Sequence, residues 1–408
     1  MRKYKNILVW SLFDFANTSF AIIVVTFLYA VYFKKVVAQG LSIGDFYWSL
    51  ATSISMIITA LISPILGAIA DYSAGKKRFL LFFTLLCIFS TASLYFVKEG
   101  NILSGIFLFV VANIGFEAGL VFYDAFLPEI TEPKNYGRVS GYGFAAGYFG
   151  SIASLSLVFP FINNNQIRET FIVSAFFFLI FSLPLFIYLK DSRKNIEHQE
   201  SYLKIGYKRV WDTISHLKNY KNLALFLLSY FFYIEGVNTV IYFAGNYASS
   251  TMGFSEIELI VFFLIVQTTA IIGSIIFGII ADSIGQKKSI IYTLVIWLIT
   301  VNLAFFVESK NHFYIVGLLA GSAMGSCQSI SRSMMSLLTP AEKKTEFFGF
   351  YSFFGKSSAV LGPLVFGFIS YITNSQRLAI ISLALFFIIG MILLFNVKDP
   401  SVSIKFKS

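Results

Sequence analysis

The chain has 408 residues, of which 57% are hydrophobic, 18% aromatic and only 13% charged. Soluble domains have about 25% charged residues, so this composition excludes an ordinary soluble protein and indicates a membrane protein. The formal net charge of +10 does not indicate nucleic-acid binding, because the basic residues lie in short clusters between long apolar runs. The two cysteines form no CxxC or disulfide pattern and the three histidines are scattered, so no metal site is expected.

About twelve stretches are apolar and long enough to cross a bilayer, which takes about 20 residues. In chain order the predicted spans are 7–33, 44–70, 79–97, 101–128, 139–161, 170–189, 222–248, 256–281, 289–307, 312–338, 346–372 and 377–397. The first span lacks a cleavage site and is longer than a signal-peptide core, so we expect it to be retained.

The only long polar stretch separates the sixth span from the seventh. It contains no apolar run long enough to span a membrane and indicates a linker between two halves. The expected organisation is an N-terminal six-helix half at 1–190, a linker at 191–221, a C-terminal six-helix half at 222–397 and a tail at 398–408.

The basic residues favour one side of the predicted spans. Of the 31 Lys and Arg, 23 fall on the side that holds both termini and the linker, six fall on the other side, and Arg332 and Lys356 lie within spans. Lys and Arg are enriched on the cytosolic side of membrane proteins. We therefore expect both termini and the linker to be cytosolic.

The two halves share motifs in the same order. The second span of each half ends in Gly-x-x-x-Asp, the fourth ends near a proline, and the first holds an acid followed three residues later by Asn-Thr. The matched motifs are Gly67–Asp71 with Gly278–Asp282, Pro128 with Pro340, and Asp14 with Glu235, separated by 211, 212 and 221 residues. Such a parallel repeat is typical of transporters that bind substrate near the bilayer midplane, between the halves.

A short basic loop follows each Gly-x-x-x-Asp motif. The loop residues are Gly75, Lys76, Lys77 and Arg78 in the first copy, which has one extra residue, and Gly285, Lys287 and Lys288 in the second. Asp71 and Asp282 lie at helix ends, where charge and helix-terminus interactions would let them latch one half to the other as gating loops. The plainer interpretation is that the basic residues only anchor the topology.

Longer segments resemble a known family. They are Phe13–Asn17, Phe122–Asp124 through Pro128 to Gly137–Gly141, Gln328–Ser333 through Pro340 to Phe348–Gly349, and Gly362-Pro363. Together with the Gly-x-x-x-Asp loops they resemble the major facilitator superfamily, and within it the "unknown major facilitator" family, whose fungal relatives are autophagy-related vacuolar amino-acid effluxers. The resemblance implies an all-α membrane protein with twelve transmembrane helices in two halves, and an amino-acid substrate.

Ionisable residues inside spans are costly and therefore indicate function. The candidates for substrate or proton binding are Asp14, Glu117, Asp124, Glu235, Arg332 and Lys356, with Asn17 and Asn238 each three residues after an acid. In the superfamily the first, fourth, seventh and tenth helices line the central cavity, and five of the six ionisable candidates fall on these helices. A carboxylate desolvated in such a cavity has a raised pKa, which would allow proton coupling.

Each candidate also has a structural interpretation. Arg332 would bind a substrate carboxylate with its planar fork, or it would only neutralise Asp124 or Glu235. Lys356 lies close enough to a span end to extend its amine to the membrane surface. Asp124 would be a gate residue paired with Arg138, and Asp14 or Glu235 would only hydrogen-bond a neighbouring helix.

The sequence thus predicts a secondary active transporter that moves a small polar solute, an amino acid or short peptide, by alternating access coupled to protons. No Walker loop is present, so neither an enzyme nor a primary pump is expected, and no cofactor is needed beyond an ion gradient. The alternatives are an exporter of lipids or hydrophobic compounds and a non-transporting receptor. We expect a monomer in a lipid bilayer, in the bacterial inner membrane or else a vacuolar or other organellar membrane, with no nucleic-acid partner.

Overall fold

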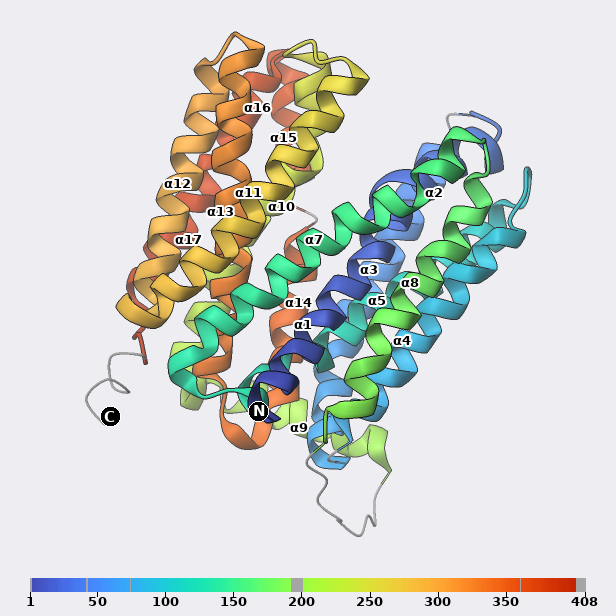
Figure 1. Cartoon of the computed structure of the whole chain (residues 1–408). Helices are drawn as coiled ribbons and strands as arrows, with labels where there is room; N and C mark the ends of the chain where they lie inside the picture. Colours follow the sequence, from blue (N-terminus) through green and yellow to red (C-terminus); the bar gives the residue numbers. More distant parts are fainter. Residues whose placement is uncertain (1, 42, 74, 192–200, 360, 401–408) are drawn as a thin grey trace. The chain divides into compact units, whose positions relative to one another are not determined.

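The computed structural model describes residues 2–41, 43–73, 75–191, 201–359 and 361–400, which form helices and connecting turns (Figure 1). Twelve helical stretches among these residues are long and apolar enough to cross a membrane, as the sequence predicts. They extend over Lys3–Val37, Ile43–Ser73, Lys76–Phe96, Ile102–Ile130, Pro133–Asn163, Ile167–Tyr188, Leu217–Ser250, Glu256–Ile284, Gln286–Phe306, Lys310–Leu338, Ala341–Thr373 and Gln376–Phe395.

The first stretch is a continuous helix with two π-helical segments. It consists of α1 (Arg2–Phe20), η1 (Ala21–Phe27), α2 (Leu28–Tyr32) and η2 (Phe33–Val37). In η1 the Thr26 hydroxyl donates to the Ala21 carbonyl, five residues earlier, at 2.9 Å. Such π segments occur frequently at functional sites, and η1 begins one turn beyond the candidate residue Asn17.

The other helices follow in the expected order. In the first half they are α3 (Ile43–Ser73), α4 (Lys76–Ser93), η3 (Leu94–Phe96), α5 (Ile102–Asp124), α6 (Leu127–Ile130), η4 (Pro133–Asn135), α7 (Tyr136–Asn163) and α8 (Ile167–Tyr188). In the second half they are α10 (Lys221–Ser250), α11 (Glu256–Ile284), α12 (Gln286–Phe306), α13 (Lys310–Leu338), η6 (Ala341–Lys343), α14 (Lys344–Ser358), α15 (Leu361–Thr373), α16 (Gln376–Ser382) and α17 (Ala384–Phe395).

The chain forms two compact units, and the first contains residues 1–126, 146–211 and 341–349. In this unit α1 packs on α8, α4 on α5 and α8, and α3 on α5. The buried rings of Trp10 and Tyr123 stack with their centres 4.7 Å apart. The Trp10 indole donates to the Tyr123 carbonyl at 3.1 Å, and the Tyr123 hydroxyl donates to the Trp10 carbonyl at 3.0 Å. These paired contacts fix α1 against α5 one turn before Asp14.

The second unit contains residues 127–145, 212–340 and the chain from 350 onward. Here α11 packs on α13, α12 on α13 and α17, and α10 on α15 and α17. Trp297 on α12 stacks on Phe387 of α17 with ring centres 5.5 Å apart. The Ser229 hydroxyl on α10 donates to the Gly390 carbonyl on α17 at 2.7 Å. Buried aromatic rings and small residues thus hold α10, which carries Glu235, in this unit.

Two helices belong to both units. α7 begins in the second unit and continues in the first from residue 146, whereas α14 begins in the first unit and continues in the second from residue 350. These are the fifth helices of the two predicted halves. Each fifth helix therefore begins in one compact unit and continues in the other. A division of the sequence at the linker does not reveal this.

The linker contains a helix that its polar composition did not indicate. α9 (Tyr202–Ser215) and the short η5 (Leu217–Tyr220) precede α10, while residues 192–200, as well as Lys405 and Lys407 of the tail, lie outside the described residues. Gly206 of α9 packs against Ile65 and Ile69 of α3 so closely that a side chain would meet them. No membrane-crossing stretch lies between Tyr188 and Leu217 in the described part of the linker.

Candidate functional site

Asp14 and Asn17 lie on one face of α1, as their three-residue spacing predicts. Both are buried in the first unit, with exposures of 8% and 3%. The Asn17 side-chain amide approaches the Asp14 carboxylate at 3.5 Å. The backbone of α7 passes close by: the Thr18 hydroxyl donates to the Gly147 carbonyl at 2.9 Å, and a Cβ at Gly147 would lie 3.7 Å from that of Asp14. The acid therefore lies where the fifth helix approaches the first.

Glu117 and Asp124 lie seven residues apart on α5. Glu117 is 5% exposed, whereas Asp124 is half-buried at the last residue of the helix. One turn before Glu117, the side-chain amide of Asn113 donates to the Ser55 hydroxyl of α3 at 2.8 Å. Sequence reasoning missed Ser55 and Asn113. The signal that would have revealed Asn113 is its four-residue spacing from Glu117 within an apolar helix.

Glu235 is fully buried on α10 and binds the start of a second helix segment. The eleventh span is broken after Ser358, where α14 ends and Ala359 forms a turn, and α15 is described from Leu361. The backbone amide of Gly362 donates to the Glu235 Oε1, which also accepts from the Thr239 hydroxyl at 3.3 Å. The N-terminus of a helix favours a negative charge, so Glu235 acts as the cap of α15.

The geometry around Glu235 explains why residue 362 is a glycine and shows which α10 side chain is the partner of Glu235. A Cβ at Gly362 would overlap both the Thr239 hydroxyl and the Glu235 carboxylate, so only glycine fits there. Asn238 is half-buried, and Thr239 is the α10 side chain that hydrogen-bonds Glu235. The acid predicted from the sequence is thus buried, and its partners in the structure are Thr239 and Gly362.

Arg332 is 2% exposed on α13 and is bound to the start of α7. Its Nε donates to the Ser140 Oγ and its Nη2 to the Ser140 carbonyl oxygen, both at 2.9 Å. The guanidinium carbon lies 4.2 Å from the centre of the Phe144 ring, and the Ser140 hydroxyl donates to the Ser329 carbonyl at 2.7 Å. These contacts fix the plane of the guanidinium, a property that Lys would not reproduce.

Lys356 lies on α14, two residues before the helix ends at Ser358. Its side chain is half-buried. The ring of Tyr351 on the same helix stacks on Tyr230 of α10, with ring centres 4.2 Å apart. This part of α14 therefore packs on α10 near the break that Glu235 caps.

Asp71 binds the start of α14. Its two carboxylate oxygens accept from the backbone amides of Thr345 at 3.0 Å and Glu346 at 2.8 Å. Gly67, one turn earlier on α3, lies so close to the Thr345 carbonyl that a Cβ would overlap it. Glu346 in turn accepts from the Arg209 Nε of α9 at 3.5 Å.

Asp282 binds the start of α7 in the same way. Its carboxylate accepts from the backbone amides of Gly137 at 2.7 Å and Arg138 at 3.1 Å, and from the Arg138 Nε at 2.8 Å. Gly278 packs directly on the Gly137 backbone, as Gly67 does on Thr345. The two signature aspartates therefore make matching contacts with the first turns of the two fifth helices.

The basic loop residues bind the ends of the sixth helix of each half. The Lys77 ammonium donates to the Leu189 carbonyl at 2.6 Å, and its backbone amide donates to Asp191 at 3.0 Å. The Lys287 ammonium likewise donates to the Phe395 carbonyl at 2.7 Å, and its amide to Asp399 at 3.1 Å. The repeat read from the sequence therefore extends to these capping contacts.

The remaining loop positions differ between the two copies. Lys76 is buried and donates to the Ala125 carbonyl at 3.1 Å, whereas Arg78 and Lys288 are exposed. Gly285 has φ 103°, which only glycine adopts readily, while Gly75 has φ −123°. The glycines that precede the third helix of each half therefore differ in conformation.

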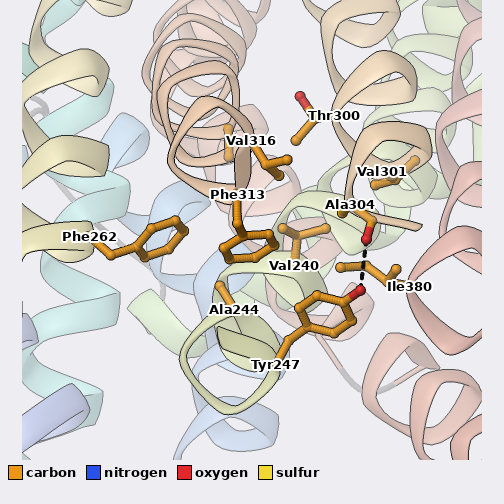
Figure 2. Close-up of a pocket in the computed structure, with 11 residues that line it drawn as sticks. Val240, Ala244, Tyr247, Phe262, Thr300, Val301, Ala304, Phe313, Val316 and Ile380 are labelled. Carbon is orange, nitrogen blue, oxygen red and sulfur yellow. Dashed lines mark hydrogen bonds between the residues drawn. The ribbon is translucent and has the colours of Figure 1, made fainter. Parts of the chain in front are cut away.

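An apolar pocket lies elsewhere in the second unit (Figure 2). The close-up shows side chains from α10, α11, α12, α13 and α16 facing it, with the Tyr247 hydroxyl donating to the Ala304 carbonyl at 2.7 Å. Thr300 and Tyr247 are the only lining residues with polar side chains, and none of the candidate residues from the sequence lines it. This pocket does not suit a polar solute.

The family described as "Vacuole effluxer Atg22 like" matches residues 46–138 and 129–401. The chain belongs to this family. It is 33% identical over 406 residues to YxiO of Bacillus subtilis, named an uncharacterized MFS-type transporter, covering 96% of this chain and 94% of that protein. It is 23% identical over 377 residues to autophagy-related protein 22 of Kluyveromyces lactis, covering 83% of this chain and 77% of that protein.

Solved structures confirm the fold of this Atg22-like chain. The human organic anion transporter MFSD10 aligns with a TM-score of 0.75 at 14% identity, covering 96% of this chain and 99% of that one. The proton:xylose symporter XylE aligns with a TM-score of 0.74 at 15% identity, covering 97% and 96%. With the family match and the relative YxiO, the Atg22-like chain is an integral multi-pass secondary transporter of the major facilitator superfamily, and not an enzyme.

Proposed function

We propose that this transporter moves a small zwitterionic solute, an amino acid or short peptide, across the bilayer by alternating access coupled to protons. The observation that carries the proposal is the buried Glu235 at the break of the eleventh span. The family's description as vacuole effluxers supports transport as the function. The protonation of a buried carboxylate depends on the groups that bind it, so a change in its partners would let it take up or release a proton.

The proposed coupling works through the cap of α15. An ionised Glu235 holds the Gly362 amide with a charge-assisted hydrogen bond and favours the positive end of the helix. Protonation removes that charge and weakens the cap, which lets the start of α15 move. Asp14, buried against α7, is the proposed proton site of the other half. Each half would thus link protonation to one neighbouring helix.

Arg332 is the proposed ligand of the solute carboxylate. Ser140 and Phe144 hold its guanidinium in one orientation, and a fixed planar fork suits bidentate carboxylate binding. Asn17, Glu117, Asp124, Asn238 and Lys356 remain proposed contributors to substrate or proton binding.

Asp71 and Asp282 are the proposed gate. Each holds the first turn of a fifth helix by two backbone amides, contacts that would form and break during the transport cycle. With them we propose the gating positions Gly67, Gly75, Lys76, Lys77, Arg78, Gly278, Gly285, Lys287 and Lys288. We further propose that both termini and the linker are cytosolic, that the protein is a monomer, and that it lies in a bacterial inner membrane.

The test is solute release from proteoliposomes. Liposomes that contain the full chain are loaded with mixed amino acids and dipeptides, a pH gradient is imposed, and released solutes are identified by mass spectrometry. We expect gradient-dependent release of particular solutes, lost in Glu235→Gln and Asp14→Asn and retained in the control Glu99→Gln, which changes an exposed side chain bonded to Gln39. Solute release no faster than from loaded liposomes without the protein would refute the amino-acid proposal. It would favour an exporter of hydrophobic compounds or a receptor.

A further inference from the structure

The linker helix α9 exposes a row of large apolar side chains. Leu203, Tyr207 and Trp211 follow one another at four-residue spacing and are 70%, 63% and 61% exposed. Residues four apart share a helix face, so the three side chains form one stripe, here called the α9 stripe. Exposed apolar residues on a membrane span are covered by lipid, but α9 is not one of the spans. The α9 stripe therefore requires another explanation.

A second side of α9 packs on the first unit. Gly206 lies against Ile65 and Ile69 of α3 so closely that a side chain would meet them. The Arg209 Nε donates to the buried Glu346 carboxylate at 3.5 Å. Two contacts thus hold α9 beside the end of α3, with the α9 stripe on a different side of the helix (Figure 1).

The third side of α9 is basic. Lys204 and Lys208 are exposed and each follows a residue of the α9 stripe, so at about 100° per residue they line the edge of the stripe that lies away from Gly206. The acid of this helix, Asp212, contacts His216 at 3.1 Å. Neither lysine forms an ion pair with any residue that the structure describes. Their charges are therefore available to an anionic partner.

The depth of α9 in the membrane follows from the length of α3. This span has 31 residues, which makes it roughly 46 Å long, whereas the hydrocarbon core of a bilayer is about 30 Å thick. A symmetric placement leaves about 8 Å of α3 outside the core at each end. Ile69 lies roughly 6 Å and Ile65 roughly 12 Å from the last residue of α3. Their contact with Gly206 therefore falls at the boundary between acyl chains and headgroups.

We propose that α9 lies on the membrane surface and binds anionic phospholipids. Trp, Tyr and Leu of the α9 stripe insert at the boundary between headgroups and acyl chains, where aromatic residues are enriched in membrane proteins. Lys204 and Lys208 bind the lipid phosphates along the edge of the stripe. A helix with an apolar side and a basic side is the usual form of a helix that lies in the membrane interface. The depth of α9 favours lipid over a protein partner in the aqueous phase.

Tryptophan fluorescence makes the position of α9 measurable. Of the four tryptophans, Trp10 and Trp297 are buried and Trp48 is half-buried, so Trp211 is the one with a largely exposed ring. The full-length protein is placed in lipid nanodiscs, and the Trp211 signal is the difference between the wild-type protein and Trp211→Phe. Bromine quenches a tryptophan that it contacts. Phosphatidylcholine brominated near the carbonyl end or near the methyl end of its acyl chains therefore reports depth, and acrylamide in the buffer reports exposure to water.

We expect bromine near the carbonyl end to quench Trp211 more strongly than bromine near the methyl end. Quenching by acrylamide alone would place Trp211 in water, and quenching by neither reagent would place it against protein, including a second copy of the chain. Either result would overturn the proposal.

The lipid preference is measured with brominated phosphatidylglycerol and brominated phosphatidylcholine at equal mole fraction. A lysine near an anionic surface strengthens binding about fivefold, so phosphatidylglycerol should associate beside Trp211 at least about fivefold more tightly than phosphatidylcholine. The double variant Lys204→Gln/Lys208→Gln should remove this preference. The control Lys35→Gln/Lys98→Gln removes the same charge from two other exposed lysines of the first unit and should retain it.

Equal association of the two lipids with the wild-type protein, or an unchanged preference in the double variant of α9, would overturn the proposal. Both measurements are made without a solute or a proton gradient. Their outcome is therefore independent of the proposed transport function, and failure of the proteoliposome experiment would leave it intact.

Discussion

Replacing Asp282 by Asn should free the start of α7. The first amides of a helix have no acceptor within the helix, and the structure gives those of Gly137 and Arg138 to Asp282 at 2.7 and 3.1 Å. An Asn side chain keeps one acceptor oxygen, presents an NH₂ group to the other amide, and loses the ionic contact with the Arg138 guanidinium. The substitution therefore removes one strong bond, weakens the other and breaks an ion pair.

The expected magnitude follows from these contacts. A hydrogen bond to a charged group contributes about 1.5–3 kcal/mol. The ion pair adds about 1 kcal/mol, because Arg138 is 43% exposed and solvent screens its charge. A loss of about 3 kcal/mol corresponds to about a hundredfold change in the equilibrium that opens this turn. The amides of residues 137 and 138 should then exchange with solvent about a hundred times faster than in the wild-type protein.

Hydrogen–deuterium exchange of the protein in nanodiscs measures this effect. The matched control is Asp71→Asn. It should accelerate exchange at Thr345 and Glu346, whose backbone amides donate hydrogen bonds to Asp71, and should leave exchange at residues 137 and 138 unchanged. Equal exchange at residues 137 and 138 in the wild-type protein and in Asp282→Asn would refute the reasoning. Acceleration at both helices in both variants would show general destabilisation instead of a local cap.

Three further predictions compare glycine substitutions in two pairs and replace Arg332. Gly285→Ala should lower the free energy of unfolding by about 1–3 kcal/mol because of its φ of 103°, while Gly75→Ala at φ −123° should lie within about 0.5 kcal/mol of wild type, as thermal unfolding in detergent would show. Gly150→Ala should destabilise strongly, since its Cβ would overlap the Phe15 carbonyl, whereas Gly245→Ala meets no atom within 4 Å; expression and monodispersity would report the difference. Arg332→Lys should reduce solute release at least tenfold, and unchanged release would assign Arg332 a purely structural role.

The sequence predicted the large features of this protein because they depend on composition and spacing. Twelve apolar stretches and the membership in the major facilitator superfamily are confirmed. The ionisable residues inside spans were also visible, because a buried acid such as Glu235 stands out in an apolar run. What they do remains a proposal.

The partners of these residues were not visible, because distant parts of the chain supply them. Glu235 accepts from Gly362, 127 residues later, at a break that the continuous apolar run conceals, although Gly362-Pro363 offers the residues for a helix start. The spacing favoured Asn238 as the neighbour of Glu235, yet Thr239 takes that place, since the three- and four-residue neighbours on a helix face cannot be separated by pattern alone. The sequence indicated only a polar linker without a membrane-spanning run and did not reveal the helix α9, whose Gly206 packs against α3.

The exchange of first turns between α7 and α14 has a consequence for biosynthesis. The backbone amides that donate to Asp71 lie 274 and 275 residues later in the chain. The first unit is therefore incomplete until residue 349 has been made. The first turns of α7 are made early but belong to a unit most of whose residues come after residue 211. Multidomain chains usually fold from the N-terminus one domain at a time. Here neither unit has all of its residues until late in the chain, so we expect both units to reach their final packing only near the end of translation.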